Sequence, residues 1–146
     1  MRPAVVTAVL LLVSILDTVT AKPDYPNFCK RFLFPPCGEG GSRIAVDRCV
    51  TFMRTKKNFN DSQAHCLSLK SDLVSLHSDY EVNFMTCLTW YSANLSKKFW
   101  IGAKRSGGVF GFTDGSKFNY NAWQPGEPSN SGQDNCVESD SNGKEK

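Results

Sequence analysis

Six cysteines, at positions 29, 37, 49, 66, 87 and 136, constrain this chain more than any other feature. Their interpretation depends on the N-terminus, where the basic Arg2 precedes an apolar run from Ala4 to Leu16. The run ends at the small residues Val19-Thr20-Ala21, and this pattern predicts a secretory signal peptide over residues 1–21. In an oxidising compartment an even number of cysteines predicts a disulfide framework, although their spacing leaves the pairing open.

The same residues do not indicate a metal centre or a catalytic one. There is no CxxC pair, and His65 and His77 are the only histidines, so too few ligands converge for zinc. No Ser/His/Asp or Cys/His set remains once the cysteines form disulfides, and we expect that the protein is not an enzyme. The net charge of +3 does not indicate a nucleic-acid partner. No segment after residue 21 is apolar enough to insert into a membrane.

Local patterns predict helices first and short strands afterwards, which is an α+β arrangement. Residues 22–36 are rich in proline and read as an extended arm. A first helix is expected over 61–69, with Ala64 and Leu67 facing inward, and a second over 78–91, opened by a capping box.

Strands and turns follow the second helix. Strands are expected at 48–53, 73–76, 99–101 and 109–112, the last one flanked by glycine turns. Residues 119–132 are rich in Asn, Gly, Pro and Ser and predict a long polar loop. Long loops in compact domains are usually functional, so this segment is the first place to look for a ligand site.

Several segments, in unbroken order from about Cys37 to Glu138, match the landmarks of one family. They are Phe59 to Cys66, Leu73-Val74-Ser75-Leu76-His77-Ser78 with Glu81 and Phe84, Trp100-Ile101-Gly102, Phe112-Thr113-Asp114-Gly115, Tyr120-Asn121-Ala122-Trp123, Glu127-Pro128-Ser129 and Asp134-Asn135-Cys136-Val137-Glu138. Each piece is weak alone, and the ordered set resembles the C-type lectin-like family.

The resemblance implies a C-type lectin-like fold, with two helices, small antiparallel sheets and a long ligand loop. It implies an N-terminal arm over residues 22–36 and a lectin-like domain over 37–146. In the family's pattern a final strand follows and carries the partner of Cys66, and the partner of Cys136 comes shortly before it. Neither is present before Lys146. We therefore expect a domain that is incomplete at its C-terminus, either as a truncated sequence or as a natural short form.

The family's pattern also implies one disulfide, between Cys37 and Cys49. Cys29 and Cys87 have no counterpart in that pattern. We predict that they bond to each other and tie the arm to the second helix, with an intermolecular bridge through Cys29 as the alternative.

In sugar-binding members of the family, oxygens from the long loop hold a calcium ion that also contacts the sugar. Carried over by position, the ligands are Glu127, Ser129 and Asp134, and they serve both calcium and sugar. Pro128 would be preceded by a cis peptide bond. The hydroxyl of Ser129 is a poorer ligand for a hard cation than the amide or carboxylate expected there, which leaves the sugar undefined.

The resemblance therefore implies a secreted, extracellular, calcium-dependent lectin of innate-defence type, whose partner is a carbohydrate or a glycoprotein. The alternative is a lectin-like protein that binds a protein target or ice, or acts as a toxin, without calcium. The sequons at Asn60 and Asn94 predict a glycoprotein. Whether the chain forms a homo-oligomer stays open.

Overall fold

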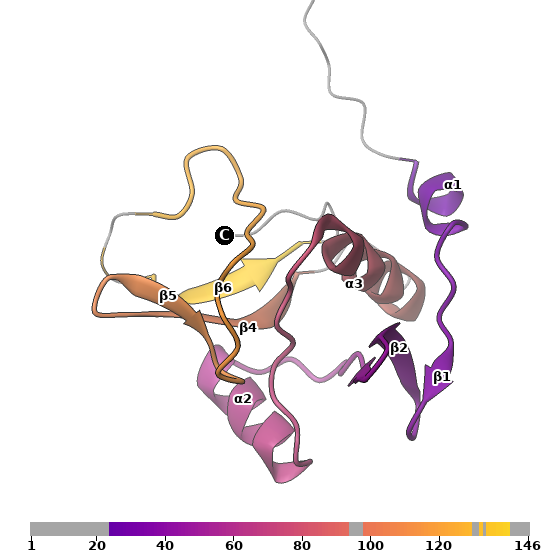
Figure 1. The fold of residues 1–146 in the computed structure, drawn as a ribbon, viewed down its shortest axis with the longest axis horizontal. Helices are drawn as coiled ribbons and strands as arrows, with labels where there is room; N and C mark the ends of the chain where they lie inside the picture. The colour runs from indigo at the N-terminus through magenta and orange to yellow at the C-terminus, as the bar shows by residue number, and fades with distance from the viewer. Residues whose placement is uncertain (1–23, 94–97, 130–131, 133, 141–146) are drawn as a thin grey trace, which may run out of the picture.

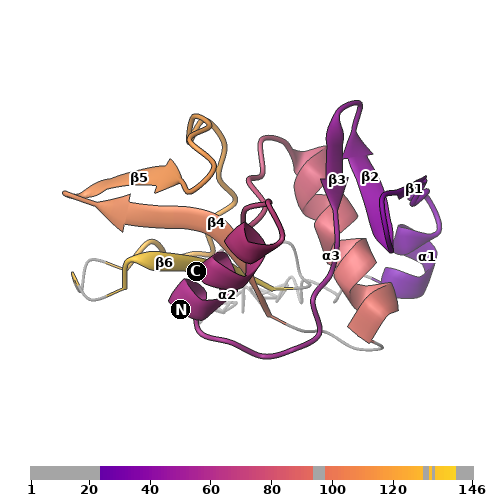
Figure 2. The same cartoon turned by 90° about the horizontal axis from the view of Figure 1, so that it is seen from below.

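The computed structural model describes residues 24–93, 98–129, 132 and 134–140. Two small antiparallel sheets lie on either side of a long helix, and this α+β architecture is the predicted one (Figures 1 and 2). The helices are α1 (Tyr25–Cys29), α2 (Phe59–Ser68) and α3 (Asp79–Ala93). The first sheet has the order β1 (Pro36–Cys37), β2 (Gly41–Ala45), β3 (Arg48–Val50). The second has the order β5 (Val109–Phe112), β4 (Phe99–Ser106), β6 (Cys136–Ser139).

Helix α3 begins at a capping box, as its sequence predicts. The Ser78 hydroxyl accepts a hydrogen bond from the backbone N–H of Glu81, at 3.3 Å. The Glu81 carboxylate in return accepts from the N–H of His77, at 2.8 Å. Because α3 lies between the sheets, most of its side chains from Val82 to Thr89 are buried. The core that α3 shares with both sheets consists of Ile44, Leu76, Val82, Phe84, Met85, Leu88, Ile101, Ala103, Phe112 and Val137.

Helix α2 forms where predicted, but its inner face is a different one. Ala64 is exposed and the exposed fraction of Leu67 is 57%, so the expectation that both face inward is wrong. The helix instead contacts the second sheet through Phe59, whose ring meets the edge of Trp100 at 5.7 Å, and through Gln63. Helix periodicity alone could not select between two weakly apolar faces, and the aromatic contact does.

The segment at 73–76 is buried at Ser75 and Leu76 but is not a strand. The carbonyl of Val74 accepts a single hydrogen bond from the N–H of Gly102, at 2.8 Å. A Cβ at Gly102 would lie 2.6 Å from the carbonyl oxygen of Leu73, so glycine is needed for this close approach. The segment thus passes over β4 at one point and forms no ladder with it.

The N-terminal arm also differs from the extended segment that was predicted. Residues Tyr25–Cys29 form α1, with Pro26 in its first turn, where proline is tolerated. Disulfide Cys29–Cys87 joins α1 to α3, with a Cα–Cα distance of 5.3 Å. Disulfide Cys37–Cys49 joins β1 to β3 across the first sheet. These are the two pairings expected from the sequence.

Candidate functional site

The long polar segment connects β5 to β6, the two edge strands of the second sheet. We call residues 119–135 the ligand loop. In Figure 1 the chain leaves β5, rises away from the sheet in orange and returns to β6 in yellow. The rings of Phe118 and Trp123 lie 5.5 and 5.1 Å from that of Phe110 on β5. Tyr120 donates a hydrogen bond to Asp79 at the start of α3. The first part of the loop is therefore fixed both to the second sheet and to α3.

Two of the three predicted ligands are brought together. The hydroxyl of Ser129 donates a hydrogen bond of 2.8 Å to the carboxylate of Asp134. Glu127 is half-buried, and its backbone N–H donates to the carbonyl of Gln124 in a tight turn. The Glu127–Pro128 peptide bond is cis, as the resemblance implies. Within the described residues, no group of three or more His, Cys, Asp or Glu side chains is placed as a metal site would require.

A fourth residue, which the sequence analysis did not select, bonds the backbone of the loop at Ser129 and at Asp134. Arg105 lies near the end of β4, and its guanidinium donates to the carbonyl of Ser129, at 3.1 Å, and to that of Asp134, at 2.8 Å. Its backbone N–H donates to the carbonyl of Asn135, at 2.7 Å. Its Cζ lies 5.4 Å from the centre of the Phe110 ring. An arginine on a strand has no sequence signature for such a role, so only the structure could reveal it.

The side chain of Gln124 contacts the chain just after β6. Its side-chain amide donates to the carboxylate of Asp140, at 3.1 Å, just after β6. The side chain therefore ties the loop to the end of the second sheet. This placement makes Gln124 suitable as a control for any test of Glu127, three residues later.

The sequons are placed as follows. Asn60 is exposed in the first turn of α2. The capping role there belongs to Asn58, whose side chain accepts from the N–H of Asp61 at 2.8 Å, so the Asn60 amide is available at the surface. Asn94 lies outside the described residues.

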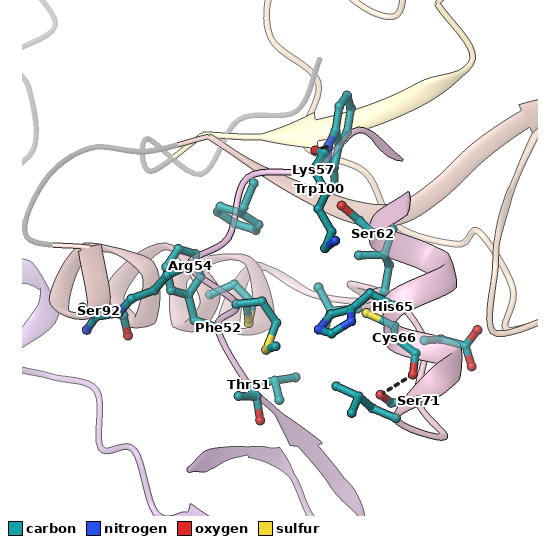
Figure 3. A pocket seen from close by; sticks show the side chains of 18 of the residues that line it. Thr51, Phe52, Arg54, Lys57, Ser62, His65, Cys66, Ser71, Ser92 and Trp100 are labelled. Atoms are coloured by element: carbon teal, nitrogen blue, oxygen red, sulfur yellow. Dashed lines mark hydrogen bonds between the residues drawn. The ribbon is translucent and has the colours of Figure 1, made fainter. Parts of the chain in front are cut away.

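A separate groove, with a volume of about 1310 Å³, lies between residues 51–57, α2 and α3 (Figure 3). Cys66, which is not in a disulfide, lines it beside His65. Burial, and to a lesser extent the charge of Asp72, raises the pKa of the Cys66 thiol. A catalytic cysteine needs the opposite shift, because the thiolate is the nucleophile. The direction of this shift does not favour Cys66 as a nucleophile.

The comparisons with known proteins decide the family. The model of the lectin C-type domain matches residues 55–146. The chain belongs to the C-type lectin domain family. It is 34% identical over 120 residues to the C-type isolectin Sp-CL4 of Scorpaena plumieri, covering 81% of this chain and 83% of that protein. It is 35% identical over 83 residues to the galactose-specific lectin nattectin of Thalassophryne nattereri, covering 56% of this chain and 52% of that protein.

Solved structures agree with this assignment. The carbohydrate-recognition domain of cow CD23, solved in the presence of a GlcNAc2Man3 oligosaccharide, superposes with a TM-score of 0.64. The two chains are 31% identical, over 75% of this chain and 83% of that one. The C-type lectin-like fold predicted from the sequence is confirmed. The relatives named here are two lectins and a carbohydrate-recognition domain, which are not enzymes, and this agrees with the expectation for this chain. None of the helices in the described part is long and apolar enough to cross a membrane.

Proposed function

We propose that the protein is a secreted lectin that binds carbohydrate through a calcium ion held at the ligand loop. The observation that supports this most directly is the contact between the side chains of Ser129 and Asp134. Both residues were expected as ligands. Their contact places a hydroxyl and a carboxylate oxygen 2.8 Å apart, close enough to coordinate one ion together.

The chemistry of the donors fits a hard cation. Glu127, Ser129 and Asp134 offer only oxygen atoms, and calcium is bound by about six to eight oxygens in flexible geometry. The remaining positions would be taken by backbone, water and sugar oxygens. When bound, the ion supplies a positive charge to which two neighbouring sugar hydroxyls can bind. The protein's own residues orient the carboxylates and supply the surrounding surface.

The relatives support a carbohydrate or glycoprotein as the partner. Sp-CL4 and nattectin are lectins, and the cow CD23 domain was solved with an oligosaccharide. Nattectin is named for galactose, whereas the family resemblance associates Glu127 with mannose-type sugars when an amide side chain is its partner, and this chain has Ser129 there. Both sugars therefore belong in the test. Secretion, with cleavage after Ala21, is the part of this proposal that N-terminal sequencing of the exported protein would check.

Retention on immobilised mannose and galactose tests the proposal. We expect the purified protein to be retained on one of them in millimolar calcium and to be eluted by a chelator. Glu127→Gln removes a charge from the proposed ligand set without changing its shape, so it should abolish retention. Asp134→Asn should do the same.

Two variants serve as controls for that test. Gln124→Ala should retain sugar binding, because its side chain contacts Asp140 and is not one of the proposed ligands. Glu138→Gln is the matched charge change on β6, where the glutamate pairs with Lys98 at the surface, and it should also retain binding. Equal losses from Glu127→Gln and Gln124→Ala would show that the ligand positions are misplaced. Retention that no chelator reverses, or no retention, would favour the calcium-independent alternative.

A further inference from the structure

The backbone and the side chains of Ser129 and Asp134 are held by two different contacts. Their side chains meet each other, at 2.8 Å. Their backbone carbonyls both meet the same guanidinium, that of Arg105, at 3.1 and 2.8 Å. One residue outside the ligand loop therefore fixes the positions of the two residues whose side-chain oxygens form the proposed site.

Arg105 is well placed to stay rigid while it does this. Its strand, β4, is the central one of the second sheet and pairs with both β5 and β6. Its backbone N–H is bonded to the carbonyl of Asn135, next to Asp134. The guanidinium also lies against the ring of Phe110 on the neighbouring strand. The side chain is half-buried, so few alternative conformations are open to it.

The chemistry of the side chain matters as much as its position. A guanidinium is planar and presents donors in a fixed fork, so it can bond two carbonyl oxygens from one position. It carries a positive charge at every physiological pH, which strengthens bonds to carbonyl oxygens. A lysine ammonium keeps the charge but is a point donor on a flexible stem, so it cannot hold both carbonyls in the same geometry.

We propose that Arg105 is a positioning residue that closes the ligand loop before any cation or sugar binds. We call the bonds from the Arg105 guanidinium to the carbonyls of Ser129 and Asp134 the clamp. The clamp brings Ser129 and Asp134 together in the metal-free protein, so a cation would meet two ligands already in place. Binding to a preformed site avoids the loss of affinity that arises when only part of the population is competent. This inference rests on the proposed function for its consequence, whereas the clamp itself requires neither calcium nor sugar.

Hydrogen exchange measured by mass spectrometry in calcium-free buffer tests the clamp directly. In Arg105→Met we expect peptides from the ligand loop to exchange about tenfold faster than in the wild type, because exchange follows the population of the open loop. Peptides from β1 to β3 should keep their wild-type rates, which shows that the change is local. Lys104→Met is the matched control, since it removes a cation from the adjacent, exposed position of β4 and should leave the loop unchanged.

Arg105→Lys separates the fork from the charge. We expect its loop to exchange nearly as fast as that of Arg105→Met. Wild-type exchange rates in Arg105→Lys would show that the positive charge alone is enough, and would refute the claim that the forked geometry of the guanidinium is required. Unchanged exchange in Arg105→Met, or an equal increase in Lys104→Met, would overturn the clamp. If Arg105→Met destabilises the whole chain, the exchange rates of Arg105→Lys are used to test the proposal instead.

The consequence for binding is measured separately. We expect about a tenth of Arg105→Met molecules to have the closed loop, so the calcium concentration for half-maximal sugar retention should rise about tenfold. Fast loop exchange in a chain whose wild type shows no calcium-dependent retention would uphold the clamp and refute the proposed function. Fast loop exchange with an unchanged calcium requirement would show that the clamp does not serve the site.

Discussion

The two sheets of this molecule are fastened by different kinds of bond. The first sheet and the N-terminal arm are closed covalently, by Cys37–Cys49 within the sheet and by Cys29–Cys87 between α1 and α3. Among the described residues, the second sheet, α2 and the ligand loop have no such bond, and both free thiols, Cys66 and Cys136, lie on this side. The half that carries the proposed site is thus held by hydrogen bonds, charge and aromatic packing. Its order should respond to pH and to single substitutions more strongly than that of the first half.

A short polar network connects the two halves. On β3, the guanidinium of Arg48 pairs with Glu81 of α3, at 2.9 Å, and bonds the backbone carbonyl and hydroxyl of Ser75. The hydroxyl of Ser75 donates in turn to the carboxylate of Asp114, at 2.5 Å, at the end of β5. Each side chain in this connection can be replaced singly, so the contribution of each residue can be measured.

The largest effect is expected from the disulfides. Cys29–Cys87 spans 58 residues and Cys37–Cys49 spans 12, and a longer closed loop restricts the unfolded chain more. Replacing both cysteines of the first pair by serine should lower the free energy of unfolding by about 4 kcal/mol, and of the second pair by about 3 kcal/mol. Urea unfolding measures both values.

Hydrogen exchange in the disulfide variants sharpens the comparison between the halves. Below the urea transition, we expect faster exchange in α1 and β1 to β3, with the ligand loop close to its wild-type rate. An equal increase in both halves would show that the molecule opens as one unit and that the contrast in bonding has no consequence for local order.

The parts of the fold that the sequence predicts are those set by neighbouring residues. Strand β5 was predicted at its observed bounds, because Gly107-Gly108 and Asp114-Gly115 stop it on both sides. The start of α3 was predicted from a capping box that involves residues three apart. The loop residues Ser129 and Asp134 were selected by resemblance, and the structure brings them into contact.

What could not be predicted depends on contacts between distant segments. The inner face of α2 is decided by the ring of Trp100, some forty residues along the chain from Phe59, with which it makes an edge contact. The segment at 73–76 has the apolar composition of a strand, yet only one ladder-like bond reaches it. Arg105 was not identified, because its role exists only once the fold places β4 beside Ser129 and Asp134.

Replacing Arg48 should have the next largest effect on stability, because it removes the bonds from β3 to Glu81 and Ser75. The exposed fractions of the Arg48 and Glu81 side chains are 29% and 12%, so Glu81 would be left largely buried without its partner. Arg48→Met should lower the free energy of unfolding by about 2 kcal/mol, less than for a fully buried pair. Urea unfolding of Arg48→Met, Glu81→Gln and the double variant measures the coupling. Additive losses would show that the pair contributes nothing beyond its separate residues.

The smallest effect is expected from Asp114, and it depends on pH. Burial raises the pKa of this carboxyl, but hydrogen bonds from Ser116 and Ser75 outweigh burial and hold the pKa below its ordinary value. Since the folded pKa is the lower one, the ionised group stabilises the folded state above the ordinary aspartate pKa of about 3.9. That contribution is lost as the pH falls through the lower, native pKa.

Asp114→Asn should therefore reduce the acid dependence of the melting temperature below about pH 5, while the value at pH 7 falls only slightly because the group is mostly exposed. Ser75→Ala removes one of the donors and should raise the pKa of Asp114, which carboxyl NMR titration reports directly. Asp47→Asn, at the exposed turn between β2 and β3, is the matched control and should leave the acid dependence unchanged. If Asp47→Asn flattens the acid dependence as much as Asp114→Asn does, the sensitivity to pH does not arise at the junction, and the contrast between the covalently braced half and the hydrogen-bonded half loses its basis.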